Sequence, residues 1–405
     1  MNGRLRRVQI VSILAITQLI GWGTSSDLLG VLGRIIARDL HVPNEIAFLG
    51  LAVSLICSGF LGPQVGAWLR RFKAGPVLSG GSICLSTGLV ILASAHDVMV
   101  YFLAWLVLGL GAALGLSAGA YAAIVEREGV DSKRVIGTLM IMTGLSSAIF
   151  WPLLSELTEF FGWRMTCLIA ASAHIVICLP LHLLALPKPL VHREEGQALV
   201  DRPPLDLSPA QHKWVFILIA FATTIFSFTG LGMSASVIEL LHRSGATQAF
   251  AIQLGSTRSV LAILARLADL SLGKRSTPVR TSIAACVLIM TGSAVLLLFN
   301  GATPVLIAFI VLNGFGAGIA SLARVLLPLS FFAVSDYGRQ ASRLMLPQNF
   351  ANAAAPVIFN ALLDHGGVSS VLSTLLALAL AALACFMTLA SIERRARMHC
   401  ESPPV

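Results

Sequence analysis

Twelve stretches of this sequence are long and apolar enough to cross a lipid bilayer, since a spanning helix needs about 20 mainly apolar residues. Hydrophobic residues make up 56% of the 405-residue chain and charged residues only 12%, about half of the roughly 25% found in soluble domains. We therefore expect an all-α polytopic membrane protein, and we exclude a soluble globule, a disordered chain and a β-barrel. The stretches are residues 10–33, 46–69, 76–95, 99–122, 136–158, 164–186, 214–238, 248–271, 280–299, 303–330, 344–363 and 368–391.

Lysine and arginine lie mostly in the connections on one side of the predicted membrane. Of the 28 such residues, only four fall on the opposite side: Arg34, Arg38, Arg164 and Arg243. Because positively charged loops stay in the cytoplasm, we expect a multi-pass protein of the inner (plasma) membrane with both termini cytoplasmic. The net charge of +9 then belongs to loops that flank the lipid bilayer, and it does not indicate a nucleic-acid partner.

Short sequence matches recur about half a chain length apart. Gly109-Leu-Gly111 returns as Gly314-Phe-Gly316, and Pro76-Val77 returns as Pro278-Val279. Such internal symmetry is typical of transporters built from two repeats, here of parallel topology. A proline-rich, charged connection separates the repeats. We predict a six-helix bundle over residues 1–186, a cytoplasmic linker over 187–213 and a second six-helix bundle over 214–405.

Glycines line one face of the stretch 99–122. Gly111, Gly115 and Gly119 recur every four residues, and Gly314 and Gly318 repeat the pattern in the second half. Small residues at this spacing let two helix backbones approach closely in lipid. The pattern predicts tight helix packing, which is also compatible with two bundles that slide during transport.

Ionised side chains within the apolar stretches are costly and normally face a partner or an aqueous cavity. Arg258 is expected either to bind an anionic substrate, since its guanidinium matches a carboxylate, or to form a salt bridge with Asp27. Asp27 is likewise a candidate for proton coupling or an arginine partner. Arg324 could support substrate binding or bond to helix-end carbonyls near Pro328.

Other polar residues have two interpretations. Tyr121, Gln348 and Asn352 could hydrogen-bond a substrate or join neighbouring helices. His174 and His182 have no carboxylate at relay spacing in the sequence, so we expect packing roles for them.

Enzyme and cofactor signatures are missing from the sequence. There is no HExxH, GxSxG, Walker or CxxC motif, and the scattered cysteines have no metal-ligand spacing. We predict no catalytic residues, no metal and no cofactor, and we do not expect an enzyme.

Two local motifs sharpen the family assignment. Phe161-Gly162-Trp163-Arg164 resembles the GWR element that opens helix six in many members of the major facilitator superfamily (MFS). Residues 66–73 occupy the place of that family's loop motif between helices two and three. There Gly66 and Arg71 agree with the motif, while Arg70 replaces its acidic residue and Lys73 its second glycine.

The resemblance implies an MFS fold and a gate at this loop. Arg70 and Arg71 would then belong to the gate, and we add Arg266 and Asp269, which lie three residues apart as an expected ion pair. Residues 21–25 and 323–339 are similar to a bacterial permease group. The region of Arg258 is similar to monocarboxylate porters and oxalate/formate antiporters, which use a helix-eight arginine for the substrate carboxylate.

We therefore predict a secondary active transporter that works by alternating access as a monomer and carries a small organic anion, with possible proton coupling. One alternative is a permease that exports drugs or toxicants, metalloids included. An alternative of another class is a membrane sensor that transports nothing.

Overall fold

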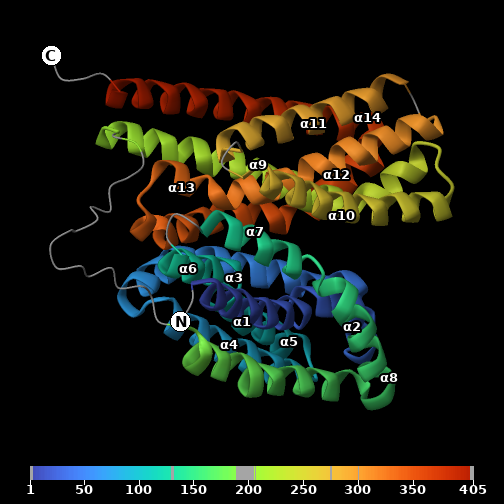
Figure 1. Cartoon of the computed structure of the whole chain (residues 1–405). Helices are drawn as coiled ribbons and strands as arrows, with labels where there is room; N and C mark the ends of the chain where they lie inside the picture. Colours follow the sequence, from blue (N-terminus) through green and yellow to red (C-terminus); the bar gives the residue numbers. More distant parts are fainter. Residues whose placement is uncertain are drawn as a thin grey trace, which may run out of the picture. The chain divides into compact units, whose positions relative to one another are not determined.

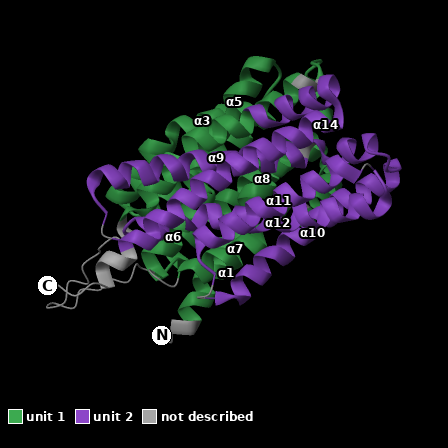
Figure 2. Cartoon of the chain, turned by 90° about the horizontal axis from the view of Figure 1, so that it is seen from above, with its two compact units in different colours: residues 1–201, 334–353 green, residues 202–333, 354–405 purple. Residues whose placement is uncertain are grey.

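The computed structural model describes residues 3–128, 132–187, 205, 207–273, 276–299 and 301–401. Throughout these ranges the secondary structure is helical and contains no strand (Figure 1). The chain forms two compact units, coloured separately in Figure 2. Unit 1 comprises residues 1–201 and 334–353, and unit 2 comprises residues 202–333 and 354–405. The all-α prediction is confirmed.

Unit 1 contains the helices of the first half of the chain and one segment of the second half. That segment consists of the 3-10 helix η5 (Val334–Asp336) and the first part of α14 (Tyr337–Glu401). The other helices are α1 (Gly3–Gly23), α2 (Ser26–Asp39), α3 (Asn44–Phe72), α4 (Ala74–Ala93), α5 (Val98–Gly115), α6 (Ser117–Glu128), α7 (Ser132–Thr143), α8 (Ser146–Ala173) and the π-helical η2 (His174–Cys178) and η3 (Leu181–Ala185).

Unit 2 contains five further helices and the remainder of α14. These are α9 (Pro209–Arg243), α10 (Gln248–Ser271), α11 (Pro278–Phe299), α12 (Thr303–Leu326) and the short α13 (Pro328–Phe331). Most of the predicted linker lies outside the described residues, and α9 begins at Pro209 behind a Ser208–Gln211 capping box. The predicted bundle boundaries at 186 and 214 stay a prediction.

Nine helical stretches among the described residues are long and apolar enough to span a membrane. Two of them, Ser132–Ala185 and Tyr337–Ala396, have 54 and 60 residues, roughly twice or more the length that a crossing needs. Gly162 (φ 78°) and Gly367 (φ 67°) interrupt these stretches with left-handed backbone and divide each into two crossings. Together with α10, whose polar residues lower its hydropathy, the crossings come to about the predicted twelve.

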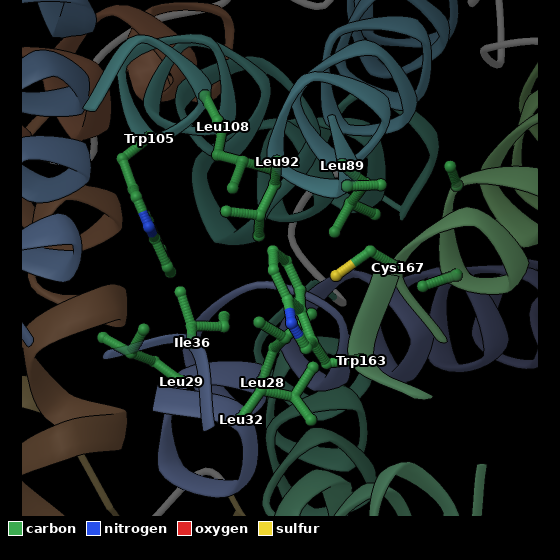
Figure 3. Packing of buried hydrophobic residues seen from close by; sticks show 14 of the residues in the cluster. Leu28, Leu29, Leu32, Ile36, Leu89, Leu92, Trp105, Leu108, Trp163 and Cys167 are labelled. Atoms are coloured by element: carbon green, nitrogen blue, oxygen red, sulfur yellow. The ribbon is translucent and has the colours of Figure 1, made fainter. Parts of the chain in front are cut away.

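Each unit has its own apolar core. In unit 1, Leu28 and Leu32 of α2 lie beside Trp163 and Cys167 of α8, and Trp105 of α5 belongs to the same cluster (Figure 3). In unit 2, side chains of α9, α10, α12 and α14 form a second cluster, including Leu240, Leu254, Phe309 and Phe359. The many van der Waals contacts among such side chains stabilise each unit.

The predicted close helix packing is present in both units. In unit 1, a methyl group on Gly111 would lie 2.7 Å from the Leu85 nitrogen, and one on Gly115 would lie 3.2 Å from the α-carbon of Gly81. In unit 2, a methyl group on Gly318 would lie 2.3 Å from the Ala262 carbonyl oxygen. The glycines therefore set the spacing of α5 from α4 and of α12 from α10.

Candidate functional site

Three of the predicted helices in unit 1 are interrupted near the middle of the stretch that crosses the membrane. Thr24 and Ser25 separate α1 from α2, Leu116 separates α5 from α6, and residues 144–145 separate α7 from α8. The stretches 10–33, 99–122 and 136–158 are therefore broken helices. Interrupted helices at membrane depth leave backbone groups that only protein or an aqueous cavity can satisfy, so they often mark binding sites.

Side-chain contacts bring the three interruptions together. Gln18 donates from Nε2 to the carbonyl oxygen of Gly115, the last residue of α5, at 2.7 Å. A methyl group on Gly21 would lie only 2.6 Å from the Leu116 side chain. Ser146, the first residue of α8, donates to Oδ2 of Asp27 at 2.8 Å. We call these contacts, with Thr24 and Ser25, the helix-break site of unit 1.

Asp27 lies in the first turn of α2 and is half-buried. Its carboxylate is stabilised there by the Ser146 hydroxyl and by the partial positive charge of a helix N-terminus. No lysine, arginine or histidine nitrogen lies within 4.0 Å of it among the described residues of unit 1. The carboxylate is thus held by a neutral donor within its own unit, and its predicted role in proton coupling stays a prediction.

Arg258 lies in α10 of unit 2 and is 9% exposed. Its Nε donates to Oδ1 of Asn313 in α12 at 2.8 Å, where the close approach of Gly314 brings the two helices together. This bond uses one of the five N–H groups of the guanidinium. Among the described residues of unit 2, no carboxylate oxygen lies within 4.0 Å of Arg258. A salt bridge to Asp27 would join two units and stays a prediction.

The other predicted charges of unit 2 bond to hydroxyl groups. Arg324 at the end of α12 donates from Nη1 to Ser227 of α9 at 2.6 Å. Arg266 donates from Nε to Ser321 at 3.0 Å, and Ser276 donates to the Asp269 carboxylate. The expected Arg266–Asp269 ion pair stays a prediction.

The remaining predicted substrate ligands lie in unit 1. Tyr121 is buried in α6, and Gln348 and Asn352 lie in the part of α14 that belongs to this unit. The Asn352 Oδ1 atom is buried without a hydrogen-bond partner among the described residues. The predicted binding residues are therefore divided between the units: Tyr121, Gln348 and Asn352 lie in unit 1 with the predicted coupling residue Asp27, and Arg258 and Arg324 lie in unit 2.

Comparisons with known proteins agree with this architecture. The sequence profile described as Major Facilitator Superfamily matches residues 11–290, more than half of the chain. The chain belongs to the major facilitator superfamily. It is therefore a multi-pass membrane protein of a transporter family, and its fold and family support secondary transport.

Solved structures share the MFS fold at low sequence identity. The human organic anion transporter MFSD10 (TETRAN) is 15% identical with a TM-score of 0.68, covering 95% of this chain and 100% of its own. The E. coli fucose:proton symporter FucP in its outward conformation is 14% identical with a TM-score of 0.70, covering 94% and 98%. A variant of the same symporter has a TM-score of 0.68 at 14% identity, covering 93% and 97%. No curated protein sequence matches this chain.

The turn between α3 and α4 shows how this MFS member departs from the loop motif. Arg70 and Arg71 are exposed in the last turn of α3. Lys73 follows with φ 68° and ψ 171°, a backbone conformation essentially confined to glycine. The Glu126 carboxylate of α6 accepts from the Ala74 backbone N–H at 3.2 Å. An acidic side chain therefore lies at this turn, although it comes from another helix.

Charged residues beyond the apolar stretches tie helix ends together within each unit. In unit 1, Arg164 of the GWR element pairs with Asp39 at 2.6 Å and lies over the Trp163 ring. In unit 2, Arg243 pairs with Glu239 and Asp364, each at 2.7 Å. Hydrogen bonds from Arg243 to Glu239 and then to Asp364 raise the pKa of its guanidinium.

Sequence reasoning missed three participants in these sites: Ser146, Asn313 and the interrupted helices themselves. Glycine and serine cluster at the interruptions, as in Gly23-Thr-Ser-Ser26 and Gly144-Leu-Ser146. Such residues favour turns and helix starts over helix interiors, so this composition was a usable signal. The Asn313 partnership carries no local signal, because it depends on how α10 and α12 cross.

Proposed function

We propose that this MFS transporter carries a small organic anion or amphipathic carboxylate and that Arg258 binds the carboxylate. The observation that carries the proposal is a buried guanidinium bonded within its unit to a neutral amide, Asn313. A buried charge without an opposite charge nearby is costly. An anionic cargo would supply the missing charge through two parallel hydrogen bonds.

Four further residues are proposed as substrate ligands. Arg324 would add a second positive charge, and Tyr121, Gln348 and Asn352 would hydrogen-bond the cargo. The buried and unpartnered Oδ1 of Asn352 supports this role, because buried polar atoms normally have a partner. MFSD10, which shares the fold, is an organic anion transporter, so the fold can accommodate such cargo.

Asp27 is proposed to couple transport to protons. It lies at the helix-break site, where its partner Ser146 is a hydroxyl and can bond to either the ionised or the protonated carboxyl group. A carboxyl group with neutral neighbours can change protonation without breaking an ion pair. FucP, which shares the fold, is a proton symporter.

The transport assay uses purified protein in proteoliposomes with radiolabelled lactate and oxalate, with and without a pH gradient. We expect uptake to follow the gradient and Arg258→Gln to raise KM by roughly 10- to 100-fold, since a charged hydrogen bond is worth about 1.5–3 kcal/mol. Arg280→Gln removes an exposed arginine of the same unit and should leave KM unchanged.

Two results would contradict the proposal. Unchanged KM in Arg258→Gln would remove the anchoring role. Transport of cationic or neutral drugs in place of organic acids would favour the exporter, and binding without any transport would favour the sensor.

We further propose that Arg70, Arg71, Arg266 and Asp269 act as gate residues at helix ends, and that the monomer lies in the inner membrane with both termini cytoplasmic. The distribution of lysine and arginine supports this orientation. A green fluorescent protein fused to the C-terminus should fluoresce, because it folds only on the cytoplasmic side. A dark fusion with full-length protein present would contradict the orientation.

A further inference from the structure

A cavity opens at one end of unit 1, where α2 ends and the chain turns between the two crossings of α8. Its volume is about 420 Å³, and it is lined by Ile35, Arg38, Asp39, His41 and Trp163. This volume lies within the range of about 300–1,000 Å³ that is typical of small-molecule sites. In Figure 1, α2 lies at the opposite end of the unit from the first turn of α1. The cavity is thus separate from the helix-break site and from the proposed substrate ligands.

The cavity presents both a cation and a carboxylate oxygen. Arg38 is exposed, and no carboxylate oxygen lies within 4.0 Å of its guanidinium among the described side chains of unit 1. Asp39 pairs through Oδ2 with Nη1 of Arg164 at 2.6 Å. That arginine is fixed in turn, because its Nη2 donates to the Ala95 carbonyl oxygen at 2.8 Å and its guanidinium lies over the Trp163 ring. The Oδ1 atom of Asp39 has no partner among the described residues.

His41 occupies a position at which glycine is usual. It follows the C-cap residue of α2 and has φ 56°. Its N–H donates to the Arg38 carbonyl oxygen at 3.2 Å, and the N–H of Val42 donates to that of Ala37 at 2.9 Å. These two bonds form a Schellman motif, whose left-handed residue is most often glycine, because a side chain strains the backbone there. The chain therefore places an imidazole in the cavity lining at a cost in backbone energy, and such outliers often mark functional residues.

Apolar side chains continue from the polar lining of the cavity. Ile35 lines the cavity and is 38% exposed. Phe160 and Phe161 precede Trp163 at the turn within α8 and are 78% and 60% exposed. Tryptophan and other amphipathic groups concentrate where a membrane protein meets the lipid headgroups. The cavity thus combines polar groups at a helix end with apolar side chains that suit lipid.

We propose that this cavity binds the headgroup of a zwitterionic aminophospholipid, phosphatidylethanolamine, from the surrounding bilayer. Arg38 and His41 would donate hydrogen bonds to its phosphate, and Oδ1 of Asp39 would accept from its ammonium group. A headgroup with both charges matches this lining, whereas a purely anionic one would lie beside Asp39 without a cation to offer it. A lipid is favoured over a dissolved zwitterion because acyl chains would cover Ile35 and the two exposed phenylalanines.

The first test compares headgroups without any cargo. Purified protein is placed in nanodiscs with equal amounts of phosphatidylethanolamine, phosphatidylglycerol and phosphatidylcholine, and the lipids that stay bound are counted by native mass spectrometry. We expect phosphatidylethanolamine to be retained preferentially. Its mono- and dimethylated forms should be retained progressively less, because each methyl group removes an N–H donor that faces Asp39. Equal retention of the three lipids would overturn the proposal.

The second test removes the contact to the phosphate. Arg38→Gln should lower the retention of phosphatidylethanolamine at least about 10-fold, since a hydrogen bond between charged groups is lost. Arg34→Gln removes another exposed arginine one turn earlier on α2, outside the cavity lining, and should leave retention unchanged. The same retention in both variants would show that the lipid binds elsewhere.

His41→Gly separates binding from folding. Glycine adopts the left-handed conformation without strain, so the melting temperature in phosphatidylcholine nanodiscs should rise. The retention of phosphatidylethanolamine should nevertheless fall, because the imidazole no longer donates to the phosphate. A residue with only a structural role would not produce these opposite changes. Retention that stays at the native level in His41→Gly would overturn the assignment of His41 to the site.

Soluble glycerophosphoethanolamine distinguishes the two sources of this headgroup chemistry. Added to the protein in phosphatidylcholine nanodiscs, it should bind far more weakly than the lipid, since it has no acyl chains. Binding as strong as that of phosphatidylethanolamine would assign the cavity to a dissolved ligand and overturn the lipid source. The proposal is independent of the proposed function, because lipid retention is measured in the absence of organic acids and does not depend on their transport.

Discussion

Ser146, the first residue of α8, donates a hydrogen bond of 2.8 Å to the carboxylate of Asp27 in the first turn of α2. The contact joins two helix starts that lie 119 residues apart in the chain. It places an acidic group at the point where α1 gives way to α2 and α7 gives way to α8. A transporter that changes conformation at these interruptions would couple that change to the protonation of Asp27.

Ser146→Ala should weaken both the helix-break site and coupling. Loss of one hydrogen bond to a charged group costs about 1.5–3 kcal/mol, so we expect a lower melting temperature in detergent and a shifted pH dependence of uptake. Ser155→Ala, on an exposed position of the same helix, is the control. A melting temperature and pH profile equal to those of the native protein would show that the bond has no role.

Gly318→Val should disrupt the crossing of α10 and α12. A methyl group on Gly318 already meets the Ala262 carbonyl oxygen at 2.3 Å, and overpacking costs about 1–3 kcal/mol or more. We expect a lower melting temperature together with weaker anion binding, because the crossing also holds Asn313 against Arg258. Gly230→Ala has open space around it and should be neutral or slightly stabilising. Equal stability of Gly318→Val and Gly230→Ala would refute close packing as the reason for the glycine.

The all-helical fold could be predicted because apolar stretches of bilayer length leave a chain few alternatives. The same argument missed the interruptions at Thr24 and Leu116, since hydropathy averages over a window and does not register where a helix breaks. The glycines that recur every four residues could be recognised in the sequence, because their spacing places them on one helix face. The partner of Arg258 could not be recognised in this way, because Asn313 is 55 residues away and becomes its neighbour only after α10 and α12 pack.

The turn after α3 contains one feature that the sequence predicted and one that it did not. Its departure from the family motif at Lys73 was visible in the sequence, and the glycine-type backbone at that residue explains what the motif's glycine would supply. The acidic group at the same turn could not be predicted from the sequence, because Glu126 contacts Ala74 from the end of α6. Sequence therefore identifies residues that are unusual for their position, while folding determines which of them meet.

Lys73→Gly should stabilise unit 1. Lysine at φ 68° and ψ 171° holds a strained backbone conformation, which costs about 1–3 kcal/mol and which glycine adopts without strain. A substitution that removes a glycine from the same backbone conformation provides the matched control. Gly162 has nearly the same backbone angles, φ 78° and ψ 161°, and open space around it, so Gly162→Ala should destabilise the protein by a similar amount. Melting temperatures that move in the same direction for both variants would contradict this account.

Asn313→Asp should inactivate anion transport while preserving the fold. The substitution keeps the size of the side chain and places a carboxylate 2.8 Å from the Arg258 Nε. That carboxylate would neutralise the guanidinium and compete with the cargo, so we expect lactate and oxalate affinity to fall at least about 10-fold, with a melting temperature equal to or above that of the native protein. Gln248→Glu adds the same charge at an exposed position at the start of α10 and should leave the affinity unchanged and the melting temperature no lower. Unaltered affinity in Asn313→Asp would show that the cargo binds elsewhere, because a carboxylate in contact with Arg258 would repel an anion bound to that residue.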